Sequence, residues 1–464
     1  MLNIIVIISY LAILFLIGVL SSRIISNTSD FLVANRKLGL LTTVSSLTST
    51  GIGGSATIVA IIYVYTRGLP GIWMNFSAGL GLILLGFTFA VKVRSMETFS
   101  LPEIVEKLYD RKARYIASFL IILAEIAWLA LVIQATQLIM TSLLNINQTA
   151  AIYLSTGIFI VYTILGGQFA VSYSDVFQMF IMFFGILFVA SPIVFIKAGG
   201  LAGLKTLPGY LLQFPINSKM GVLDVLSLIF LMGFPHLVGP DIYAKILSAR
   251  DENVARQGAL LSGILRIIWG VAIAIIALGA KKLLPNMENP AFVLPQLIVN
   301  IFNPYLSGIL IAAFIATMMS SADTILLTGS TVLLNDIFSF LLKNKNNLLI
   351  IRLFVLLVGI LGLLIALYMK DIIKTLELAY TIFSSGLIIP IIAGFYKEKL
   401  KVNKNGALAS MIGGGGISLL LKLNIIKIFP QINPVLIGMS VSLILMFLGS
   451  IVKFNKNSTD AVSQ

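Results

Sequence analysis

The chain has 464 residues, of which 58% are hydrophobic and only 11% are charged, and its formal net charge is +14. This composition excludes a soluble globular domain and indicates a polytopic membrane protein. The positive charge does not indicate nucleic-acid binding, because the basic residues lie in short loops between apolar runs and form no single patch.

Hydropathy predicts an all-α fold with about 13 transmembrane helices. The first apolar run begins at the N-terminus without a basic leader, so we interpret it as a retained span and not as a cleaved signal peptide. With the N-terminus outside, the cytoplasmic loops hold about twice as many Lys and Arg as the outer loops, which predicts a cytoplasmic C-terminus. The expected spans are 2–22, 40–66, 70–94, 114–142, 150–166, 171–197, 222–247, 254–280, 304–337, 348–369, 372–396, 405–421 and 432–453.

Two of these spans contain clustered helix breakers. The second span contains STGIGG at 49–54, and the seventh contains GFPHLVGP at 233–240. Two broken spans that lie five apart are typical of an inverted five-plus-five repeat, in which the two halves have opposite orientations. The predicted units are a leading helix and loop (1–39), a first repeat (40–197), an extracellular linker (198–221), a second repeat (222–396), and two further helices with a tail (397–464).

One face of the ninth span is lined with hydroxyl groups. Its Ser and Thr residues recur every three or four positions, and Asp323 lies beside them. Hydroxyl, carbonyl and carboxylate oxygens are the ligands that a hard cation such as sodium prefers. The face therefore indicates an ion site, although hydroxyls alone also serve to pack membrane helices. Its members are Thr317, Ser320, Ser321, Thr324, Thr328 and Thr331.

Other polar residues within the spans have simpler interpretations. We expect Glu125, Arg266 and Glu377 to form structural ion pairs with neighbouring helices. We expect His236 to bond a carbonyl that a helix break leaves free, although it could also line a solute pocket. The chain has one histidine, no cysteine and no nucleotide-binding, HExxH or Ser/His/Asp signature, so we expect no enzyme activity.

Four stretches together resemble the sodium:solute symporter family, a branch of the LeuT-like fold. The resemblance covers nearly the whole chain. The stretches are SDFLVANRKLG (29–39), YTILGGQFAVSYSDVFQ (162–178), GPDIYAKILSARDENVAR (239–256) and MMSSADTILLTGST (318–331).

The resemblance implies where ions would bind. One sodium would lie between the second and ninth spans, where carbonyls of Ser49 and Ile52 face the carbonyl of Thr317 and the hydroxyls of Ser320 and Ser321. Some family members hold a second sodium. In this chain its ligands would be Ser320 together with Asp175, Asp323 and Thr324.

The resemblance also implies a solute site at the membrane midplane, between the two broken spans. Its candidates are Thr50, Gly53, Trp128, His236, Asp241 and Tyr380. The expected function is sodium-coupled import of an amino acid, an organic acid or a sugar across the cell membrane. The alternatives are a proton-coupled or uncoupled transporter of the same fold, or a channel or structural membrane protein.

Overall fold

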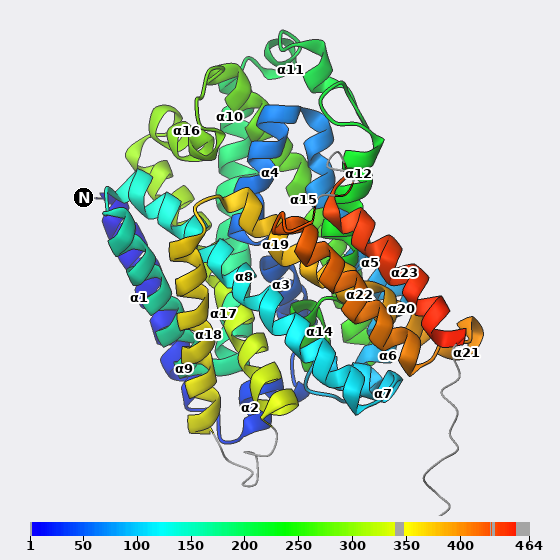
Figure 1. The fold of residues 1–464 in the computed structure, drawn as a ribbon. Helices are drawn as coiled ribbons and strands as arrows, with labels where there is room; N and C mark the ends of the chain where they lie inside the picture. Colours follow the sequence, from blue (N-terminus) through cyan, green and yellow to red (C-terminus); the bar gives the residue numbers. More distant parts are fainter. Residues whose placement is uncertain (1, 339–347, 427, 429–431, 452–464) are drawn as a thin grey trace, which may run out of the picture.

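The described residues fold almost entirely as helices, without a β-strand among them (Figure 1). This computed structural model describes residues 2–338, 348–426, 428 and 432–451, so the tail that we expected to be cytoplasmic lies outside these residues. The helices are α1 (Leu2–Ser22), α2 (Thr28–Val33), α3 (Leu40–Ile52), α4 (Gly54–Arg67), α5 (Trp73–Thr88), α6 (Ala90–Ser95), α7 (Leu101–Leu108), α8 (Arg111–Leu144), α9 (Gln148–Met182), α10 (Ser191–Lys197), α11 (Gly200–Leu204), α12 (Val222–Leu228), α13 (Phe234–Val238), α14 (Pro240–Ser248), α15 (Glu252–Leu283), α16 (Val293–Ile301), α17 (Pro304–Thr331), α18 (Leu348–Tyr368), α19 (Ile372–Phe383), α20 (Ile389–Phe395), α21 (Lys397–Leu400), α22 (Lys404–Lys422) and α23 (Pro434–Ile451).

Four π-helical stretches, which carry one extra residue per turn, continue or connect these helices. They are Phe183–Ala190, Ile229–Gly233, Val332–Ile337 and Ser384–Ile388.

Within the described residues, nine helices are long and apolar enough to cross a membrane, and the bent pair α3 and α4 raises the number to ten. The expected spans 2–22 and 405–421 coincide with α1 and α22. The expected spans 150–166 and 171–197 form one helical run, Gln148–Lys197. A straight helix of that length would extend for about 75 Å, more than twice the thickness of a bilayer core.

Gly167 divides that long run. Its φ of 49° and ψ of −155° lie outside the helical region. A Cβ at this position would lie 2.7 Å from the Phe31 ring of α2, so only glycine fits both the backbone angle and the contact. The kink thus stands where the sequence predicts a boundary between two spans.

Both predicted helix breaks are present, and both form at glycine. Gly53 has a φ of 54° between α3 and α4, and the two helices meet there at an angle of 50°. Gly239 has an extended backbone, with φ −70° and ψ 146°, between α13 and α14. In Figure 1, α3 and α14 lie in the interior of the helix bundle, with α8 passing in front.

Helices α5 and α15 pack backbone against backbone. A Cβ on Gly79 would lie 2.8 Å from the carbonyl oxygen of Gly263, and a Cβ on Gly263 would lie 2.6 Å from the carbonyl oxygen of Gly79. On another face of α5, a Cβ on Gly81 would lie only 2.0 Å from the carbonyl oxygen of Gly233. These glycines let α5 approach α15 and the segment before α13 more closely than side chains would allow. We call these contacts the glycine seam.

The hydroxyl-bearing helix α17 lies at the centre of the fold. Every residue from Leu310 to Thr331 is buried, and the helix packs against α1, α3, α8, α9 and α18. Just beyond it, the buried carboxylate of Asp336 accepts hydrogen bonds from Ser100 (2.9 Å) and from Arg114 Nε (2.8 Å). Arg114 also pairs with Glu106, so this charged cluster joins α7, α8 and the chain after α17.

Candidate ion and solute site

The break between α3 and α4 lies directly against α17. The hydroxyl oxygens of Ser320 and Ser49 lie 3.0 Å apart. A Cβ added to Gly53 would lie 3.3 Å from Ser321 Oγ, and one added to Gly54 would lie 2.2 Å from Thr317 Oγ1. The structure therefore brings together all five residues of the first predicted ion site, counting Ile52, which immediately precedes the break.

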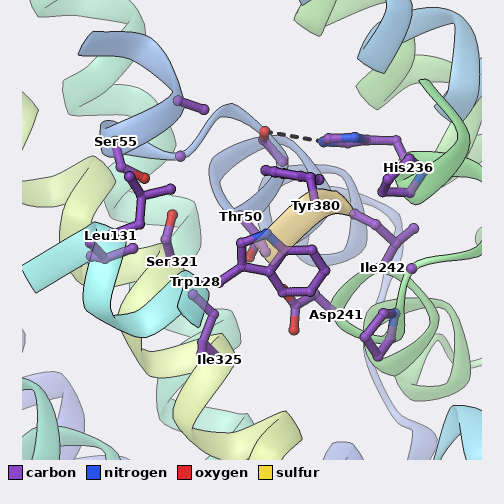
Figure 2. Close-up of a pocket in the computed structure, with 17 residues that line it drawn as sticks. Thr50, Ser55, Trp128, Leu131, His236, Asp241, Ile242, Ser321, Ile325 and Tyr380 are labelled. Carbon is purple, nitrogen blue, oxygen red and sulfur yellow. Dashed lines mark hydrogen bonds between the residues drawn. The ribbon is translucent and has the colours of Figure 1, made fainter. Parts of the chain in front are cut away.

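The break also frees backbone oxygens from helical hydrogen bonding. Helix α3 ends at Ile52, and the N–H of Gly53 still donates to the carbonyl of Ser49 at 3.3 Å, so the carbonyls that lose a helical partner are those after Ser49. His236 has Nδ1 2.6 Å from the carbonyl of Met232 and Nε2 3.4 Å from the carbonyl of Gly51 (Figure 2). A neutral imidazole has one N–H and can donate to only one of the two, so the expectation that His236 bonds the freed carbonyl stays a prediction. On the opposite helix, Ser321 donates to the carbonyl of Thr317 at 3.1 Å. The end of α3 and the hydroxyl face of α17 thus lie against each other in the buried interior, and carbonyl and hydroxyl oxygens are the ligand chemistry of a small hard cation.

The second set of predicted ion ligands is less compact. Asp175, fully buried on α9, accepts from Ser320 at 2.6 Å and also from Ser46. Thr324 instead faces Thr50, with 3.1 Å between the two hydroxyl oxygens. Asp323 accepts from Thr163 at 3.1 Å, and its other oxygen has no hydrogen-bond partner.

Sequence reasoning missed Lys245, which lies on α14. Its ammonium is completely buried and pairs with Asp175, with 3.5 Å between Nζ and Oδ2. The available signal was a single basic residue in the apolar stretch IYAKILS, directly after the second break. A buried lysine needs a carboxylate partner, so this position could have been matched to one of the buried aspartates.

A cavity of about 60 Å³ lies beside the break (Figure 2). Ser321 and Ile325 of α17 form part of its wall. All six residues predicted for the solute site line this one cavity: Thr50, Gly53, Trp128, His236, Asp241 and Tyr380. The rings of Trp128 and Tyr380 meet edge to face, with centroids 5.0 Å apart.

Three charged residues were expected to form ion pairs, and within the part of the chain that the structure describes one of them does. Glu377 pairs with Lys422 of α22, as predicted. Glu125 is fully buried on α8, and neither of its carboxylate oxygens has a hydrogen-bond partner. Arg266 is buried on α15, and its Nε and Nη1 are also unpartnered. The expectation was therefore wrong for Glu125 and Arg266, because helical periodicity shows which face a residue occupies but not what lies opposite.

A family model described as "Sodium:solute symporter family" matches residues 31–414. The chain is 22% identical to high-affinity choline transporter 1 of Caenorhabditis elegans, over 74% of this chain and 63% of the transporter. It thus spans less than two thirds of the length of that relative. It is 26% identical to sodium/proline symporter 2 of Staphylococcus saprophyticus (88% of this chain, 84% of the symporter) and 26% identical to the sodium/pantothenate symporter of Escherichia coli (96% and 95%).

Solved structures share the arrangement of helices. A substrate-bound, outward-open Na⁺-coupled sialic acid symporter superposes with a TM-score of 0.85, at 18% identity over 98% of both chains. MhsT in complex with L-phenylalanine gives a TM-score of 0.61, at 13% identity over 89% of this chain and 98% of MhsT. At these identities the likeness establishes the fold alone. The protein is therefore an all-α, multi-pass membrane protein with the inverted five-plus-five repeat of the LeuT-like fold, and it belongs to the sodium:solute symporter family.

Proposed function

We propose that this protein is a sodium-coupled symporter that imports a small organic solute across the cell membrane by alternating access. The observation that best supports this proposal is the meeting of the α3–α4 break with the hydroxyl face of α17 beside a cavity. Relatives that this chain matches over more than four fifths of both lengths are named as sodium symporters of proline and pantothenate.

The coupling ion would bind at Ser49, Ile52, Thr317, Ser320 and Ser321. Gly53 and Ser321 also line the cavity, so the ion and the solute would share a wall. A sodium that draws these oxygens together fixes that wall in place, and the solute then meets an already ordered surface. This is positive coupling between two ligands. Each sodium ion that enters the cell down the membrane potential releases about 2.3 kcal/mol of free energy per 100 mV, which can drive solute uptake.

A second sodium at Asp175, Asp323 and Thr324 would have to compete with Lys245. The lysine ammonium already balances the charge of Asp175, and Thr324 is bonded to Thr50. We therefore propose the first set of ligands as the coupling site.

The test is uptake into proteoliposomes that contain the purified chain, with sodium or potassium outside. A thermal-shift screen with proline, choline, pantothenate and sialic acid first identifies which of these solutes bind the protein. Those that bind are then used in the uptake assay. We expect uptake to require sodium, and we expect Ser320→Ala and Ser321→Ala to raise the sodium concentration needed for half-maximal uptake. Ser440→Ala is the matched control, because the Ser440 hydroxyl is exposed and bonds only within its own helix.

The outcome separates the proposal from its alternatives. Equal uptake in potassium, driven by an imposed pH gradient, would indicate a proton-coupled transporter. Uptake that is neither saturable nor concentrative would indicate a channel. If both serine variants kept the wild-type dependence on sodium, the proposed ion site would be refuted, even if uptake still required sodium.

We also propose that the N-terminus is outside and the C-terminus cytoplasmic. The chain has no cysteine, so a single cysteine introduced at an exposed loop position is the only thiol. Lys205→Cys in the proposed outer linker should react with a membrane-impermeant maleimide on intact cells. Lys399→Cys should react only after permeabilisation, and the reverse pattern would invert the topology.

A further inference from the structure

Two acidic side chains next to the cavity have no positive partner. Asp241, at the start of α14, lines the cavity, and its Oδ1 is buried without a hydrogen-bond partner. The carboxyl group of Glu125 on α8 is fully buried within electrostatic reach of Asp241, and neither of its oxygens has a hydrogen-bond partner in the described part of the chain. The Asp323 and Asp175 carboxylates belong to the other side of the site, where Thr163, Ser320 and Lys245 bond them.

Neighbouring basic groups balance this pair only in part. Among the described residues, no lysine or arginine forms an ion pair with Glu125 or Asp241. Lys245 forms its ion pair with Asp175 and acts on Asp241 only through space, and Arg266 lies beside Gly51. Two interacting buried carboxyl groups do not both ionise without a counter-charge, so the pair shares one proton and carries one negative charge. Burying that charge alone costs several kcal/mol, so the arrangement favours a cation that arrives from the cavity.

Aromatic rings border the same space. Trp128 follows Glu125 by three residues on α8, which places both on one face of the helix. Figure 2 shows Trp128, Tyr380 and Asp241 around the cavity, and the indole N–H of Trp128 has no acceptor. The face of an aromatic ring attracts an organic cation, most strongly when the cation is shielded from water.

We infer that the solute carries a positively charged nitrogen, which binds against Trp128 and Tyr380 and is balanced by the Asp241–Glu125 pair. This inference rests on the proposed function, and it names the chemical class of the solute. Proline and choline meet the requirement. Pantothenate and sialic acid do not, because each carries a carboxylate and no cationic nitrogen, and the acidic pair would repel them.

The test is binding to the purified full-length chain in saturating sodium, read by thermal shift and by tryptophan fluorescence. The ammonium probes are the amino acids, choline and tetramethylammonium, and the other probes are pantothenate, sialic acid and glucose. We expect only ammonium probes to bind. We expect Asp241→Asn and Glu125→Gln each to weaken binding by about tenfold or more, as for loss of a charged partner. Glu252→Gln, at an exposed position on α15, should leave binding unchanged.

Asp241→Glu keeps the charge and should retain part of the affinity, which separates a role in binding from a general loss of folding. Stabilisation by a carboxylate or sugar probe, or by no ammonium probe at all, would overturn the inference. It would also be overturned if Na⁺ or K⁺ alone stabilised the protein and both carboxyl variants abolished that effect, because the pair would then hold a metal ion. The last of these results would also move the proposed ion site, but none of them decides whether uptake requires sodium, on which the proposed function depends.

Discussion

Replacing Gly54 by alanine would place a methyl group exactly where α4 meets α17. The added Cβ would lie 2.2 Å from Thr317 Oγ1 and 2.5 Å from Met318 Sδ. Real Cβ atoms stay at least 3.0 Å from such neighbours, so the gap to Thr317 must open by 3.0 − 2.2 = 0.8 Å. The methionine side chain can move aside. The threonine hydroxyl is bonded to the carbonyl of Phe314 at 2.7 Å and can turn away only by giving up that buried bond.

The size of the effect follows from the cost of overpacking. Extra methyl groups in a well-packed interior cost about 1–3 kcal/mol. If this strain falls on the state in which α4 and α17 close around the ion, the sodium requirement should rise by about 5-fold to about 150-fold. Alanine stabilises a helix by about 1 kcal/mol relative to glycine. A weaker response to sodium in the variant therefore could not be explained by helix propensity.

The assay is the sodium dependence of uptake and of thermal stabilisation, with Gly157→Ala as the matched control. Gly157 also lies in a helix, and a Cβ added there would have no atom within 4 Å. Its replacement by alanine therefore shows how the substitution acts when it causes no clash. If Gly54→Ala folds and keeps the wild-type sodium requirement, the break does not close on α17 when sodium binds, and the reasoning fails.

The remaining predictions concern buried charge. Asp336→Asn should destabilise the protein in detergent by about 1.5–3 kcal/mol, because Arg114 loses its buried carboxylate partner and keeps only its pair with Glu106. Asp224→Asn is the control, because Asp224 forms a half-exposed pair with Arg67, and it should change stability by less than about 1 kcal/mol. If Asp336→Asn and Asp224→Asn lowered the thermal midpoint equally, burial of Asp336 would not explain its effect. Lys245→Met should cost about 3–5 kcal/mol, and combining it with Asp175→Asn should recover part of that loss, because neither member of this pair then remains as an unpaired charge. Strictly additive losses would show that the two groups do not interact.

Local signals in the sequence predicted the breaks and the hydroxyl face. Glycine and proline mark the helix breaks at 49–54 and 233–240, and a three-to-four spacing marks the buried face of α17. The ion ligands and the six cavity residues came from the family resemblance and not from spacing. The structure brings them into proximity, and their binding roles remain predictions.

The partners of buried charges were harder to predict. Glu125 and Arg266 have the same appearance in sequence as Glu377, yet only Glu377 has an ion-pair partner. Lys245 lies in a segment that hydropathy treats as apolar, and only the folded chain shows that Asp175 lies opposite. Pairing between helices depends on tertiary packing. Local patterns in a single sequence do not reveal which individual side chains this packing brings together.

The glycine seam has a consequence for movement during transport. Where α5 lies on α15, backbone rests on backbone, and sliding either helix by one residue would drive a side chain into a carbonyl group. Such an interface resists shear, so α5, α15 and the chain before α13 should travel together. The contact between α3 and α17 is made instead through small hydroxyls that can exchange partners within a fraction of a turn. The rearrangement between outward and inward states should therefore occur mainly along the contact between α3 and α17. The helices of the glycine seam should move as one rigid unit.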